Sequence, residues 1–70
     1  MFLKKDNKDI VFFTTNEKMF NDVKNVFKQN RIPFEVGSFK ERAITHYISV
    51  SPFYYKKAFK LAEETRKKYN

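Results

Sequence analysis

The 70-residue chain has no cysteine, which excludes a disulfide and a cysteine-based zinc site as sources of stability. Its one histidine, His46, has no second histidine with which to form a metal site and no cysteine to activate. A single glycine also excludes a glycine-rich phosphate loop. These absences favour a non-enzymatic protein without metal or cofactor, in which His46 has a structural role between helix and sheet.

Long apolar runs are also missing. Only Met1, Phe2 and Leu3 precede the charged residues at the amino end, and a signal peptide needs about 7 to 15 apolar residues. No other segment approaches the roughly 20 apolar residues of a membrane-spanning helix. We therefore expect a cytoplasmic protein that makes no use of a membrane.

Aromatic side chains and positive charge are what the chain has in excess. Nine Phe and four Tyr are available to build a small core, since each buries roughly 150 to 250 Å². Fifteen Lys and Arg against eight Asp and Glu give a net charge of +7, which suits an anionic partner such as nucleic acid or a phosphorylated ligand. Because the cations are spread along the chain and not gathered in one block, an ordinary solvated surface is the favoured interpretation.

The first half of the chain predicts a strand followed by a helix. Residues 10–15 are β-branched or aromatic, which favours a buried strand, and residues 2–5 could pair with it as a short edge strand. Thr15 or Asn16 can cap a helix, which Asn30 would end in a left-handed conformation before Pro33. Apolar residues recur at helical spacing along it: Met19, Phe20, Val23, Val26 and Phe27.

The second half predicts two strands and a helix. Residues 34–39 and 43–51 alternate in polarity like strands, and residues 40–42 form a compact polar hairpin loop. Ser51 followed by Pro52 is typical of a helix start, and this helix extends to about residue 68. The side chains expected on its buried stripe are Tyr55, Ala58, Phe59, Ala62 and Thr65.

The order strand, helix, strand, strand, helix predicts an α+β fold of a single domain spanning residues 1–70. A right-handed crossover followed by a hairpin gives a three-stranded antiparallel sheet of order 2-3-1, with both helices on one face. This is a truncated ferredoxin-like fold that lacks its fourth strand. We expect the core in residues 9–68, with residues 1–8 as an edge strand or a flexible end.

One face of this sheet is left without a cover. If the helices cover Val36, Ile44, Ile48 and Val50, the alternating side chains point to the other face. An open face with aromatic side chains suggests association. We expect the contact residues to be Phe39 and Tyr47, with Lys40 and Arg42 at the rim.

The predicted function is that of a small non-enzymatic regulatory or adaptor module. It would associate with an unidentified protein and with itself, as a homodimer through the open face or a sheet edge. The alternative is an RNA or single-stranded nucleic-acid binder whose bases stack on the sheet. Residues 45–50 lack the basic-glycine-aromatic pattern of such sheets, so this alternative ranks second.

A second candidate site lies where the first helix starts. In the 2-3-1 topology, free amides near Thr15 and Asn16 lie at the same end of the sheet as Lys40 and Arg42, so together they could hold a phosphate or carboxylate. Ordinary helix capping beside a solvated hairpin is the favoured interpretation, because no glycine-rich loop is present.

Two segments carry a resemblance to a known family. Residues 31–36, RIPFEV, follow an amphipathic helix, and residues 48–58, ISVSPFYYKKA, join a strand to an alanine-containing helix. In these features, residues 10–66 resemble the prokaryotic signal transducing proteins, small bacterial domains with the same order of elements. The resemblance implies a fold similar to that of trimeric nitrogen-regulator proteins and a role in signalling. Asn30-Arg31 stands where that family commonly has a glycine, and no functional residue is transferred.

Overall fold

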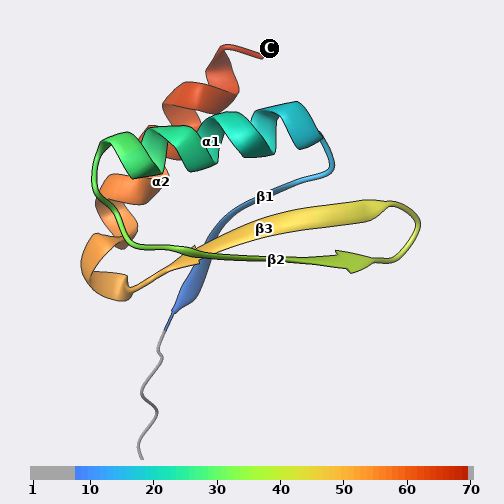
Figure 1. Cartoon of the computed structure of the whole chain (residues 1–70), viewed down its shortest axis with the longest axis horizontal. Coiled ribbons are helices and arrows are strands. Elements are labelled where there is room, and N and C mark those ends of the chain that lie inside the picture. Colours follow the sequence, from blue (N-terminus) through green and yellow to red (C-terminus); the bar gives the residue numbers. More distant parts are fainter. Residues whose placement is uncertain (1–7, 70) are drawn as a thin grey trace, which may run out of the picture.

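The computed structural model describes residues 8–69 as one sheet with two helices packed on the same side (Figure 1). The strands have the order β1-β3-β2, and both pairings are antiparallel. The predicted βαββα fold and its 2-3-1 sheet order are therefore confirmed, whereas the predicted edge strand at residues 2–5 lies outside the described residues. The elements are β1 (Asp9–Thr14), α1 (Glu17–Gln29), β2 (Glu35–Lys40), β3 (Ile44–Val50) and α2 (Pro52–Lys67).

The core lies between β1, β3 and the two helices. Alternation along β1 sends Phe12 into the core, where it is 2% exposed, and Phe13 to the opposite face, where it is 63% exposed. A register shift between Ile10 and Phe12 lets Val11 be buried as well. The largest fully buried side chains come from α1 and β3: Phe27, Ile48, Val23 and Val50.

Both helices begin at the expected caps. Asn16 Oδ1 accepts a hydrogen bond from the Met19 amide at 3.1 Å, and Ser51 Oγ accepts one from the Phe53 amide at 3.2 Å. Each bond satisfies one of the amides that have no partner within the helix. The serine is followed by Pro52, whose missing amide is not needed at that position.

The end of α1 differs from the prediction. Asn30 has φ −98°, so its predicted left-handed conformation is wrong, and Arg31 has the positive φ of 57° instead. The Ile32 amide donates to the Phe27 carbonyl at 3.0 Å, and Ile32 is buried beside the core. This hydrogen bond requires the residue before Ile32 to be left-handed, and that residue is Arg31.

We expect Arg31→Gly to stabilise the protein by about 0.5–1 kcal/mol, because glycine adopts this φ without the steric penalty of a side chain. Urea unfolding followed by circular dichroism measures the change. Asn30→Gly is the matched control, since Asn30 has a negative φ: glycine there adds unfolded-state entropy and removes the hydrogen bond from Asn30 Nδ2 to the Val26 carbonyl at 2.8 Å, so it should destabilise the protein. Equal effects of the two substitutions would contradict the assignment of strain to Arg31.

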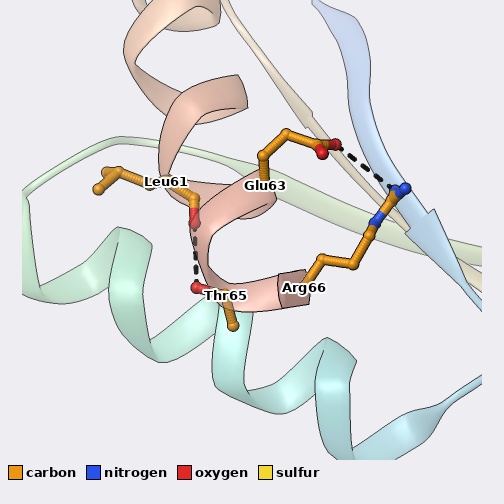
Figure 2. A network of polar contacts seen from close by, with 4 residues as sticks. All are labelled: Leu61, Glu63, Thr65 and Arg66. Atoms are coloured by element: carbon orange, nitrogen blue, oxygen red, sulfur yellow. Dashed lines mark hydrogen bonds and ion pairs between the residues drawn. The ribbon is translucent and has the colours of Figure 1, made fainter. Parts of the chain in front are cut away.

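Small side chains bring α2 close to its neighbours. Ala58, Ala62 and Thr65 are buried, and Thr65 Oγ1 donates to the Leu61 carbonyl at 3.0 Å (Figure 2). The predicted burial of Phe59 is wrong: its side chain is 46% exposed, because the three small residues occupy the centre of the buried stripe. Neither α2 nor any other helix in residues 8–69 is long and apolar enough to cross a membrane.

The helices do not extend over β2. In the described part of the chain, α1 and α2 contact β1 and β3 but not β2, which pairs only with β3. Val36 and Ile44, expected beneath the helices, are therefore about half exposed. The hairpin of β2 and β3 extends beyond the helical layer (Figure 1), so part of this side of the sheet is open as well.

A hydrogen bond joins the chain after α2 to α1. The Tyr69 hydroxyl donates to Asp22 Oδ2, a carboxylate on the flank of α1. This bond, then burial, and then the charge of Asp22 raise the pKa of Tyr69 above its ordinary value of 10.0. Because the folded state holds the phenol proton more tightly, the stabilisation is fully present below pH 10 and is lost as the pH rises through the raised pKa.

We expect Asp22→Asn to lower the pKa of Tyr69 towards its ordinary value, since the charged acceptor is removed. Tyrosinate absorbance during an alkaline titration measures this, and Tyr69→Phe identifies the signal among the four tyrosines. Superimposable titration curves for the parent and Asp22→Asn would show that the hydrogen bond does not form in solution.

Candidate functional site

The side of the sheet away from the helices carries an aromatic cluster. Phe13 on β1 and Gly37 on β2 both pair with Tyr47 on β3, so these residues form one row across the sheet. Phe39 is in the next row, opposite Thr45. The open sheet face consists of these residues and their same-face neighbours: Ile10, Phe13, Glu35, Gly37, Phe39, Thr45, Tyr47 and Ser49.

Tyr47 lies flat on this face because Gly37 has no side chain. A Cβ atom at Gly37 would lie 2.8 Å from Cε2 of Tyr47 and closer still to Cζ and Oη. The ring is therefore partly buried against the sheet, with the Phe39 ring centroid 6.3 Å away at a tilt of 33°. Phe13 and Phe39 project further into solvent, so they are the more accessible rings of the cluster.

Charge is distributed unevenly between the two layers. Among the residues of the open sheet face, only Glu35 is charged, and its Oε2 lies 3.5 Å from Lys8 Nζ. Residues 8–14 and 34–50, which form the sheet layer, contain three cations and three anions. The helix-bearing segments 15–33 and 51–69 contain ten cations and four anions. Within residues 8–69, the excess of positive charge is thus in the helical layer, whereas the aromatic cluster lies on a layer without net charge.

A depression of about 610 Å³ lies at the end of β1, where the open sheet face meets the start of α1 and the end of α2. It contains one cation, Arg66, and one anion, Glu41, with apolar side chains and threonine hydroxyls between them. Its lining residues are Phe13, Thr14, Thr15, Met19, Phe39, Glu41, Thr45 and Arg66.

Arg66 reaches the depression from α2. Its Cζ lies 5.6 Å from the ring centroid of Phe12, and Nη2 lies 3.8 Å from Oε2 of Glu63 (Figure 2). The aromatic ring and the carboxylate together orient the guanidinium towards β1. In the sequence, Arg66 is one of several cations near the end of the last helix. Its spacing of three residues from Glu63 predicts an ion pair within that helix, but it does not predict that Arg66 lies beside β1.

The structure joins parts of the two predicted sites. Phe39, predicted as a contact residue of the open face, and Thr15, predicted to help hold an anion, both line the depression. Tyr47 lies beside Phe39. Asn16 is close by but uses its side-chain oxygen to cap α1. The depression therefore combines residues that the sequence interpretation treated separately.

The two predicted cations are placed differently. Lys40 pairs with Ile44, so its side chain is on the helix side of the sheet, opposite to Phe39. Arg42 lies in the turn between β2 and β3, and neither residue lines the depression. The cation that lines the depression together with Thr15 is Arg66 instead.

His46 lies on the helix side, between β3 and α1. Its ring stacks on Phe20 with centroids 4.7 Å apart at 17°, and Lys24 Nζ lies 4.7 Å from the same Phe20 centroid. Within residues 8–69, no group of three His, Cys, Asp or Glu side chains could hold a metal ion. Stacking of His46 on the buried ring of Phe20 is compatible with the predicted structural role of this histidine.

Comparison of the chain with protein-family models, curated proteins and solved structures found no match. The resemblance to prokaryotic signal transducing proteins stays a prediction.

Proposed function

We propose that the protein is a small non-enzymatic regulatory or adaptor module that forms a homodimer through its open sheet face. The observation that carries this proposal is the exposed aromatic cluster on a layer without net charge, in a chain of net charge +7. Contiguous apolar patches of this kind on a small protein mark interaction sites. A signalling role, as the family resemblance implies, is compatible with such a module.

The charge distribution favours a second copy as the partner. Two chains of +7 repel each other, and the repulsion is weakest where the approaching surfaces are neutral. Contact through the open sheet faces places the two cationic helical layers on the outside of the dimer, as far apart as the fold allows. Phe13 and Phe39 then supply the apolar area that the interface needs.

The nucleic-acid alternative has less support. Stacking of bases on Phe39 and Tyr47 would require an excess of cations beside them for the phosphates. Within residues 8–69 the charges around the open sheet face balance instead: Glu35 lies 3.5 Å from Lys8, and Glu41 and Arg66 both line the depression. Binding of single-stranded RNA or DNA at about 50 mM salt, lost on Phe39→Ser, would favour the alternative over self-association.

We expect light scattering of the unmodified chain, at concentrations of tens of micromolar and above, to give twice the chain mass of 8.5 kDa. Because the interface is apolar and the like charges are screened by salt, the dimer should persist or strengthen between 50 and 500 mM salt. A mass of one chain at every concentration and salt level would contradict the proposal.

A further inference from the structure

We propose that the free edge of β2 binds an acidic segment of another protein in an extended conformation, as an additional strand of the sheet. The proposal rests on the adaptor function proposed above and gives the chemistry of the partner. Because β2 pairs only with β3, every second residue of β2 presents its amide and carbonyl to the free edge. Such a row of unpaired donors and acceptors is what strand addition requires.

β2 is better suited to strand addition than β1, the other edge of the sheet. Its pairing with β3 continues without a break from Glu35 to Lys40, and it contains no proline. The pairing of β1 shifts register between Ile10 and Phe12, and such irregularities protect a strand edge. α2 also packs on β1, whereas neither helix contacts β2. The edge of β2 is therefore both regular and uncovered.

The helix side of β2 offers apolar surface next to this edge. Val36 lies on that side and is 49% exposed, because neither helix contacts β2. A strand added at the free edge would lie about 4.8 Å from β2, so its side chains on the helix side would contact Val36. Phe13 and Phe39 are on the opposite side of the sheet, so this contact does not compete with the dimer interface.

α1 runs alongside β2 in the opposite direction. Near the start of α1, Phe20 stacks on His46, and His46 pairs with Ser38 of β2. Near the end of α1, the Phe27 ring contacts Phe34, which directly precedes β2. The middle of α1 is therefore level with the middle of β2.

The flank of α1 that faces the edge of β2 is cationic. Asp22 is on the flank towards α2, since its carboxylate accepts the hydrogen bond of Tyr69, and Lys24 lies about 200° further round the helix. Lys28 shares the flank of Lys24, because residues four apart are neighbours on a helix surface. α2 packs mainly on β1, at the other edge of the sheet, so Lys24 and Lys28 are on the side of β2.

A third cation lies on β2 itself, since the Lys40 side chain is on the helix side. Among residues 8–69, neither Lys28 nor Lys40 has an ion pair. The anion on the same flank of α1 is Glu17, in the first turn, so the cations are in excess. An acidic segment complements this charge, whereas the β2 edge of a second copy would bring the same cations against it.

The test compares three hexapeptides, blocked at both ends, by two-dimensional amide NMR at about 50 mM salt. Glu-Thr-Glu-Val-Glu-Thr is acidic and forms strands readily, Glu-Gly-Glu-Gly-Glu-Gly has the same charge but a low strand propensity, and Lys-Thr-Lys-Val-Lys-Thr has the opposite charge. We expect the first peptide to bind with a dissociation constant on the order of 1 mM, at least about 5-fold tighter than the other two.

Strand addition has a specific signature in these spectra. On binding of the acidic peptide, alternate amides of β2 should shift downfield and exchange more slowly with water, because they gain hydrogen bonds. Intermolecular nuclear Overhauser effects should connect the backbone of the peptide with that of β2. The amides of β1 should not gain protection.

Charge variants test which lysines the peptide contacts. Lys24→Gln combined with Lys28→Gln should weaken binding of the acidic peptide about 2- to 10-fold, as exposed ion pairs allow. Lys60→Gln combined with Lys67→Gln removes the same charge from α2, which does not contact β2, so it is the matched control and should leave the affinity unchanged. If the α1 variant disturbs the fold, Lys40→Gln on the exposed strand still tests the pairing.

The proposal is overturned if the acidic peptide shifts no β2 amide at about 5 mM, if the glycine-containing peptide binds as tightly, or if the two double variants bind alike. Backbone contacts between the β2 strands of two copies would overturn it as well, because a second copy would then occupy the edge. Measurements at a protein concentration low enough for a single-chain mass keep this test separate from self-association. Failure of the dimer would leave peptide binding measurable, and failure of peptide binding would leave the mass unchanged.

Discussion

We expect Phe27→Ala to leave the chain largely unfolded at 25 °C, the largest stability effect of any single substitution considered. Phe27 is completely buried, its ring makes an edge contact with Phe34 at 5.8 Å, and its carbonyl accepts the Ile32 amide that ends α1. Truncation of a buried Phe costs about 3–5 kcal/mol. A chain of this size without disulfides has roughly that much stability in total.

Circular dichroism and urea titration at low protein concentration measure this effect without added stability from association. Phe53→Ala is the matched control, because Phe53 is 85% exposed and its removal should change the free energy of unfolding by less than about 0.5 kcal/mol. If Phe27→Ala unfolded cooperatively at the same urea concentration as the parent, the core would not depend on this ring.

We expect Phe13→Ser combined with Phe39→Ser to abolish self-association while the fold is kept. Both side chains lie on the open sheet face and are about half exposed or more, so they contribute little to the core. A symmetric dimer would lose four aromatic contacts, which together cost roughly 3 kcal/mol or more of binding free energy. This corresponds to a dissociation constant roughly 100-fold larger. Tyr47 is left in place because it covers Gly37.

Analytical ultracentrifugation of this double variant should give the mass of one chain at concentrations where the parent is a dimer. Phe53→Ser removes an even more exposed phenylalanine from the first turn of α2, outside the open sheet face, and should leave the dimer intact. Equal effects of the two variants would indicate non-specific association of exposed aromatic side chains.

The fold could be predicted because each element follows from local patterns. The alternation of β3, the apolar stripe of α1 and the caps at Asn16 and Ser51 each depend on neighbouring residues. The right-handed crossover rule and the short hairpin then leave one sheet order. The strand period also predicts that one of Phe12 and Phe13 is buried and the other exposed, but it does not predict that the buried one is Phe12.

The remaining features depend on contacts between distant segments. Arg66 lines the depression because α2 packs on β1, which are far apart in the sequence. The exposure of Val36 depends on how far the helices extend over the sheet, which periodicity does not determine. For the same reason, Phe59 was expected in the core, although the small residues of α2 decide which part of its surface is buried.

The most direct test of self-association through the open sheet face is an isotope-filtered NMR experiment on a mixture of labelled and unlabelled copies. We expect intermolecular nuclear Overhauser effects that connect the rings of Phe13, Phe39 and Tyr47 of one copy with the same rings of the other. The absence of such signals in a sample with dimer mass, or their appearance only at α1 and α2, would contradict the proposed interface.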